Sequence, residues 1–117
     1  MIPGDDPDAH AGAVFAALAD PTRRAVLRDV AARGPITATE LAELLPVSRQ
    51  AVAKHLGVLR DAGLVEPERA GRENRYTAAA APLAEAERWL AATGAAWDRR
   101  LALLSRLARR ADAPDGG

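Results

Sequence analysis

The chain has 117 residues, of which 49% are hydrophobic and 3% aromatic, with 16 basic and 16 acidic side chains and no cysteine. This length indicates one domain, and a core with so few aromatic residues must be built from Ala, Leu and Val, a composition that favours helices. The missing cysteines exclude disulfides, thiolate metal sites and cysteine nucleophiles, and the zero net charge argues against a protein that coats nucleic acid without specificity.

The ends of the chain carry no pattern typical of secretion or membrane insertion. Residues 1–8 are acidic and contain no apolar run. No stretch approaches the roughly 18 apolar residues of a membrane span. We therefore expect a cytoplasmic protein without a membrane partner, with one domain at residues 9–110 and disordered tails at residues 1–8 and 111–117.

The first two helices are predicted on either side of Asp20. A carboxylate at this position can accept the free N–H groups at a helix start, and Pro21 suits the first helical position. The second helix is expected to run from Pro21 to about residue 32, before a Gly-Pro pair. The first helix, at residues 9–18, has an apolar face that contains Val14, Phe15 and Leu18.

Two further short helices joined by a tight turn are predicted at residues 38–62. Ile36 is expected in a short strand, and residues 37–40 (Thr-Ala-Thr-Glu) fit a capping box at the start of the third helix. Pro46 ends this helix. Ser48 can cap the fourth helix, which is expected to reach about residue 62 and to close at a glycine.

The fourth helix separates an apolar face from a polar one. At about 100° per residue, Val52, Leu56 and Leu59 fall on one stripe, which we expect to face the core. Gln50 and Lys54 point the opposite way. A glutamine can pair with adenine and a lysine with guanine, and the absence of acidic residues between residues 48 and 60 suits an approach to phosphate.

A β-hairpin is predicted after the fourth helix, with strands at residues 64–69 and 75–77 and a turn at residues 70–74. Arg72 at its tip can enter the minor groove of DNA or hold a phosphate, although a solvated hairpin is the alternative. The predicted fold is therefore mostly α-helical with a small β-hairpin. Two short helices joined by a tight turn and followed by a hairpin form a winged helix-turn-helix. In this fold the second of the two helices lies in the major groove of DNA.

Four other basic residues are candidates for contacts to DNA. Arg49 flanks the polar face of the fourth helix. His55 lies beside the core stripe, where a histidine is either packed and hydrogen-bonded or reaches a phosphate from the flank. Arg23 and Arg24 follow the cap of the second helix and can hold a phosphate or pair internally with Asp20 and glutamate residues, and we favour the internal role.

The last predicted helix, at residues 82–110, has an apolar stripe that is too long for so small a domain to cover. We expect it to pack against a second copy of the chain. Symmetric pairing would place two recognition helices about 34 Å apart, which predicts an inverted-repeat operator. The interface expected for this homodimer contains Phe15, Leu18, Leu90, Trp97, Leu101 and Leu104.

Three segments of the chain resemble the ArsR family of bacterial repressors, at residues 15–31, 40–65 and 71–78. The middle segment, ELAELLPVSRQAVAKHLGVLRDAGLV, is the most specific of them. Trp89 and Trp97 suit a branch of the family without metal sites. The resemblance implies a homodimeric, sequence-specific DNA-binding repressor, in some cases of its own operon. It implies DNA contacts at Ser48, Arg49, Gln50, Lys54, His55 and Arg72.

Other activities find less support in the sequence. The metal sensors of that family carry a cysteine pair or a His/Asp/Glu set on the last helix, whereas the two histidines here lie at opposite ends of the predicted fold. We therefore expect no metal and no cofactor, and the sequence indicates no effector. A winged-helix module that binds protein instead of DNA is the alternative, but the hydrophobic outer face that it needs is missing. No catalytic constellation indicates an enzyme.

Overall fold

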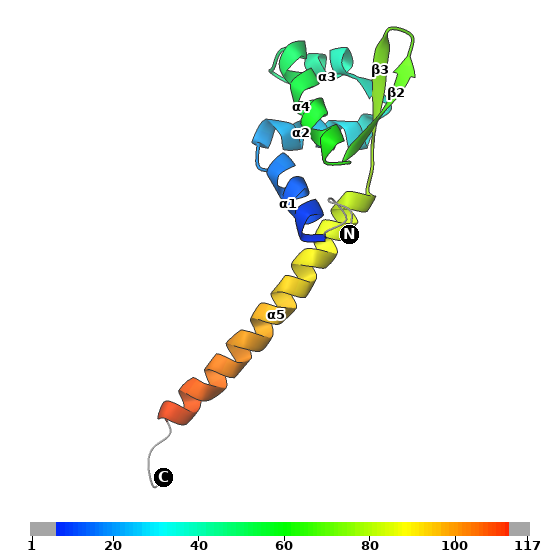
Figure 1. The fold of residues 1–117 in the computed structure, drawn as a ribbon. Helices are drawn as coiled ribbons and strands as arrows, with labels where there is room; N and C mark the ends of the chain where they lie inside the picture. The colour runs from blue at the N-terminus through cyan, green and yellow to red at the C-terminus, as the bar shows by residue number, and fades with distance from the viewer. Residues whose placement is uncertain (1–6, 113–117) are drawn as a thin grey trace.

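The computed structural model describes residues 7–112 of the chain. Figure 1 shows a body of short helices and a small sheet, from which one long helix extends. In chain order the elements are α1 (Pro7–Ala17), α2 (Pro21–Arg33), β1 (Ile36–Thr37), α3 (Ala38–Leu44), α4 (Arg49–Asp61), β2 (Val65–Ala70), β3 (Glu73–Ala78) and α5 (Ala81–Asp112).

The terminal helices reach further than the sequence predicted. Helix α1 begins at Pro7 instead of residue 9, and α5 ends at Asp112 instead of residue 110. Asp8, expected in a tail, accepts a hydrogen bond from the indole N–H of Trp89 and so fixes the start of α1 to α5. The other residues of the predicted tails, 1–6 and 113–117, lie outside the described residues.

Local side-chain caps start α2 and α3 where the sequence predicted them. The carboxylate of Asp20 accepts the backbone N–H groups of Thr22 and Arg23 at 2.8 and 3.1 Å. The hydroxyl of Thr37 accepts the N–H of Glu40 at 3.1 Å, while the Glu40 carboxylate accepts the N–H of Thr37 at 3.2 Å. Each helix therefore begins with two of its free N–H groups satisfied by a side chain.

The sheet has three antiparallel strands in the order β1-β3-β2, so the predicted hairpin is joined by β1, in which Ile36 lies opposite Tyr76. The turn predicted at residues 70–74 was too long. Ala70 pairs with Glu73, which leaves Gly71 and Arg72 in the turn. Gly71 has a φ of 64°, a value that permits so tight a connection and keeps Glu73 in the ladder.

The core lies between α2, α3, α4 and the sheet, as the helical periodicity predicted, and α1 and α5 add Val14, Ala17 and Ala86 to it. Its side chains are aliphatic, and no aromatic ring in the described part of the chain is fully buried. The largest side chains that are fully buried are Leu41, Leu56, Leu59, Leu64, Val14, Val26, Val30, Val52 and Val65.

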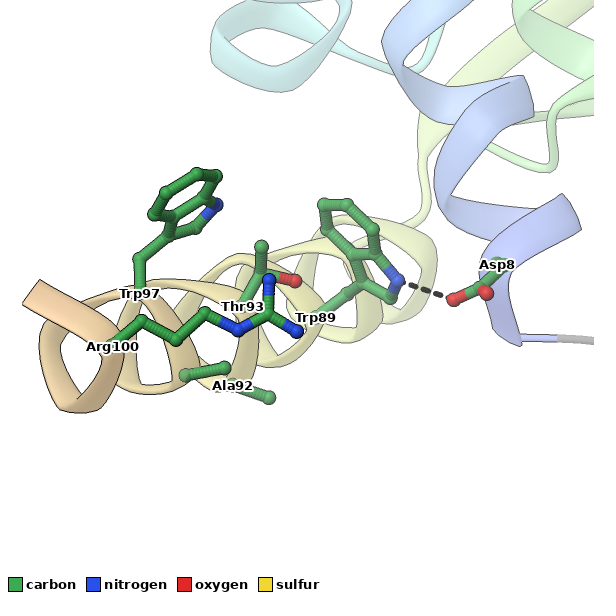
Figure 2. A pocket seen from close by; sticks show the side chains of 7 residues that line it. Asp8, Trp89, Ala92, Thr93, Trp97 and Arg100 are labelled. Atoms are coloured by element: carbon green, nitrogen blue, oxygen red, sulfur yellow. Dashed lines mark hydrogen bonds between the residues drawn. The ribbon is translucent and has the colours of Figure 1, made fainter. Parts of the chain in front are cut away.

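Helices α1 and α5 pack together through aromatic and polar contacts. The rings of Phe15 and Trp89 meet edge to face, with centroids 5.7 Å apart and an interplanar angle of 65°. Figure 2 shows the hydrogen bond from Trp89 to Asp8, with Trp97 and Arg100 further along α5. These side chains border a shallow hollow of about 460 Å³ beyond the start of α1.

Beyond this hollow α5 continues without cover from the described part of its own chain (Figure 1). Its apolar side chains are about half exposed, with Trp97 at 56% and Leu104 at 59%. Across the described residues, none of the helices combines the length and the apolar character that a membrane crossing requires. We call this uncovered part of α5, residues 90–112, the arm. Its exposed large hydrophobic side chains are Leu90, Trp97, Leu101, Leu103, Leu104 and Leu107.

Candidate nucleic-acid interface

Helix α4 presents its polar face to solvent while its apolar stripe is buried. Val52, Leu56 and Leu59 are each fully buried against the core, which confirms the predicted inner face. On the opposite side Gln50 and Lys54 are exposed. Their side chains are thus available for contacts to base edges, as a recognition helix requires.

The turn before α4 fixes where this helix begins. The backbone N–H of Val47 donates to the carbonyl of Leu45 at 2.8 Å, which makes the connection from α3 tight. The hydroxyl of Ser48 then accepts the backbone N–H of Ala51 at 3.1 Å. The structure thus gives Ser48 a capping role. The residue is exposed at the N-terminal end of α4, and the N-terminal ends of helices commonly bind phosphate.

Arg49 is tied to the wing, a contact that the sequence did not reveal. Its Nε donates to the hydroxyl of Thr39 at 2.9 Å, and its guanidinium lies 3.6 Å from a carboxylate oxygen of Glu73. The Thr39 hydroxyl donates to that same oxygen at 2.7 Å. The three residues join α3, α4 and β3 on the surface of the molecule.

The wing carries basic side chains beside α4. Arg72 is exposed at the tip of the hairpin, in the turn predicted for it. A hollow of about 190 Å³ separates the wing from α4. The residues around it are Ala38, Arg49, Ala53, Arg72, Glu73, Asn74 and Tyr76. The surface between recognition helix and wing is therefore concave and carries two guanidinium groups.

Comparisons with known proteins place this arrangement in a family. Residues 18–68 match a family described as a helix-turn-helix domain. The HTH-type transcriptional regulator YuzN of Bacillus subtilis is 46% identical, over 51% of this chain and 72% of that protein. The transcriptional repressor SdpR of the same organism is 32% identical, over 66% of this chain and 84% of that protein.

A solved structure shows the same fold over most of its length. The ArsR-like transcriptional regulator from Rhodococcus sp. RHA1 is 49% identical to this chain, with a TM-score of 0.77, and the match covers 86% of this chain and 93% of that one. The chain belongs to the ArsR family. It is a DNA-binding transcriptional regulator with a winged helix-turn-helix fold, as the sequence resemblance implied.

His55 of this ArsR-family protein lies half-buried on the flank of α4. Its Nδ1 is enclosed and has no hydrogen-bond partner among the described residues. The backbone N–H of Arg23 is the main cause of the lowered pKa of Asp20, and His55 lies close enough to that carboxyl group to contribute. The structure thus places His55 against the start of α2, and its predicted phosphate contact stays a prediction.

Arg23 and Arg24 take the internal role that we favoured, although their guanidinium groups bind backbone carbonyls and not the carboxylates that we expected. A guanidinium nitrogen of Arg23 donates to the carbonyl oxygens of Ala16 and Ala17, at 3.4 and 3.2 Å. Arg24 donates to the carbonyl of Leu18 at 2.6 Å. These cations satisfy the free carbonyl groups at the end of α1 and hold α1 against α2.

Among the side chains that the structure describes, no three His, Asp or Glu residues gather closely enough to hold a metal ion. His10, for example, lies 3.8 Å from Glu85 across the contact between α1 and α5, without a further ligand of this kind near them. The sequence also contains no cysteine.

Proposed function

We propose that the protein represses transcription as a homodimer on an inverted-repeat operator, with the promoter of its own gene as the first candidate site. The observation that carries this proposal is the division of α4, where Val52, Leu56 and Leu59 are fully buried while Gln50 and Lys54 are exposed. Repression is the activity named for the relative SdpR.

In the proposed complex α4 lies in the major groove, where Gln50 and Lys54 read base edges. Arg49 and Arg72 hold the backbone on the two sides of the hollow, and Arg72 can also enter the minor groove. Ser48 and His55 are proposed as further phosphate contacts at the start and on the flank of α4. We propose no catalytic step for this surface.

The proposed dimer buries the arm of α5 against the same arm of a second copy. Leu90, Trp97, Leu101 and Leu104 are 52–59% exposed in the single chain. Their burial would supply a favourable hydrophobic term of about 25 cal/mol per Å² of apolar surface, which must exceed the entropy lost on association. Phe15, which is 36% exposed, borders this surface. Leu18 is half-buried and packs on the core of its own chain, so we give it a minor share.

A mobility-shift experiment with the DNA upstream of the protein's own gene, at several salt concentrations, tests the proposal. A specific complex should form, and its affinity should fall steeply with salt because phosphate contacts release counterions. Footprinting should show two protected half-sites about one helical turn apart. Equal affinity for that DNA and for unrelated duplexes would contradict a sequence-specific regulator.

A winged-helix module that binds protein is the second candidate. Such a module would need an apolar outer face on α4, and the exposed side chains there are Arg49, Gln50, Ala53 and Lys54. The polar character of this face favours DNA.

A further inference from the structure

An acidic side chain stands among the cations of the proposed DNA surface. Glu73 is the first residue of β3, next to Arg72 at the wing tip. Its carboxylate lies 3.6 Å from the guanidinium of Arg49 and accepts the hydroxyl of Thr39 at 2.7 Å. A carboxylate next to a bound duplex repels the backbone, so its presence here requires an explanation.

The Arg49–Glu73 pair is open to solvent and can exchange partners. The side chain of Arg49 is 64% exposed and that of Glu73 is 40% exposed. An exposed pair of this kind contributes little, a factor of about five or less in an equilibrium constant. A DNA phosphate, which also offers oxygen acceptors to a guanidinium, can therefore replace the carboxylate at little cost.

The space beside the pair fits such an exchange. The hollow between α4 and the wing has a volume of about 190 Å³ and is bordered by Arg49, Arg72 and Asn74. A water molecule takes about 30 Å³ in the liquid, so the hollow can hold a phosphate group with some water. Among the residues that the structure describes, no carboxylate lies within ion-pair distance of Arg72, which leaves its charge available.

We propose that the hollow is a seat for one backbone phosphate of duplex DNA, and that Glu73 takes the place of that phosphate on Arg49 in the free protein. This inference rests on the proposed DNA-binding function. It adds that the carboxylate of Glu73 competes with the DNA phosphate for Arg49. On binding, Arg49 moves from Glu73 to the phosphate. Glu73 thereby lowers affinity for any duplex and lowers the number of counterions that binding releases.

The test compares Glu73→Gln with the wild-type protein in binding to the operator and to an unrelated duplex. The amide oxygen of glutamine still accepts the Thr39 hydroxyl, so the substitution removes the charge and keeps the hydrogen bond. We expect about two- to fivefold tighter binding to both duplexes near 0.1 M salt, the size of one exposed ion pair. The plot of log affinity against log salt should become steeper by at most about 1, because the wild-type carboxylate takes up a cation when Arg49 leaves it and so offsets part of the counterion release from the phosphate.

Two further variants separate this exchange from a general change of charge. Glu68→Gln removes a charge from the same wing at a residue that faces Arg75 in the ladder, and it should leave the salt slope unchanged. In an Arg49→Gln background, Glu73→Gln should have no more effect than Glu68→Gln, because the cation on which it acts is gone.

The possible results bear on different claims. If Glu73→Gln weakens binding, or matches Glu68→Gln in affinity and slope, the competing role of Glu73 is wrong although the protein still binds DNA. If the wild-type protein binds neither duplex, the proposed function itself fails. Thermal unfolding of each variant shows whether its fold is retained.

Discussion

Phe15 of α1 meets Trp89 of α5 edge to face, with ring centroids 5.7 Å apart. This contact joins the first and last helices of the chain, and the hydrogen bond from Trp89 to Asp8 is a second contact between the same two helices. The base of the exposed arm is thus fixed to the body that carries α4.

Phe15→Leu tests the contribution of the aromatic pair. Leucine keeps most of the apolar surface and loses the ring contact, so the free energy of unfolding should fall by about 1 kcal/mol. Urea unfolding of both proteins at one fixed protein concentration measures this change in the free energy of unfolding. In a Trp89→Leu background the same substitution should cost clearly less, and an equal cost in both backgrounds would show that the ring contact contributes nothing.

The sequence predicted those features that depend on near neighbours in the chain. The caps at Asp20 and Thr37 need residues two or three positions away, and the buried stripe of α4 follows from helical periodicity. The contacts that it missed join distant segments. Asp8 and Trp89 are 81 positions apart, and the hydrogen bond from Thr39 to Glu73 spans 34. Glu73 reaches α3 and α4 because the wing turn is tighter than predicted.

Gly57 offers a test of how closely α4 approaches DNA. It lies on the same face as Gln50 and Lys54, and a Cβ added there would meet no other atom within 4 Å. Gly57→Ala should therefore raise the free energy of unfolding by about 0.5–1 kcal/mol. It should nevertheless weaken operator binding by about tenfold, because the methyl group would crowd the bases.

Gly12→Ala is the matched control for this substitution. Gly12 is also a helical glycine where an added Cβ would meet no other atom within 4 Å, but it lies on α1, away from the wing. The substitution should stabilise the protein by a similar amount and leave operator affinity unchanged. If both alanine variants bound the operator like the wild-type protein, α4 would not approach the bases closely at Gly57.

Lys54→Glu should abolish operator binding and leave the dimer intact. The residue is exposed on the outer face of α4, so reversal of its charge replaces attraction to DNA by repulsion without disturbing the core. Mobility shift and sedimentation measure the two properties. Arg99→Glu, the same change of charge on α5, is the control and should retain binding. Normal operator binding by Lys54→Glu would mean that another face contacts DNA.

Asp20 should make part of the stability depend on pH. The backbone N–H of Arg23, followed by that of Thr22, holds the pKa of Asp20 below its ordinary value of 3.8. Because the folded state favours the charged carboxylate, this stabilisation is complete above the ordinary pKa and is lost as the pH falls through the lowered value. Asp20→Asn keeps a capping side chain and removes this titration.

Thermal unfolding between pH 7 and pH 3 compares the two proteins. The wild-type melting temperature should decline more below about pH 4 than that of Asp20→Asn. Asp98→Asn, an exposed site on α5, should follow the wild-type curve. Parallel curves for Asp20→Asn and the wild-type protein would show that the cap does not couple folding to protonation.

Leu104→Asp should convert the dimer to monomer, and Leu103→Asp should do so much less. The two leucines are similarly exposed, at 59% and 51%, but successive helical residues point about 100° apart. Leu104 shares the face of Leu90, Trp97 and Leu101, whereas Leu103 lies away from it. A buried carboxylate without a partner is costly, so sedimentation velocity should show monomer for Leu104→Asp at concentrations where the wild-type protein is dimeric. A full-strength Leu104→Asp dimer, or equal disruption by both variants, would move the interface to another face of α5.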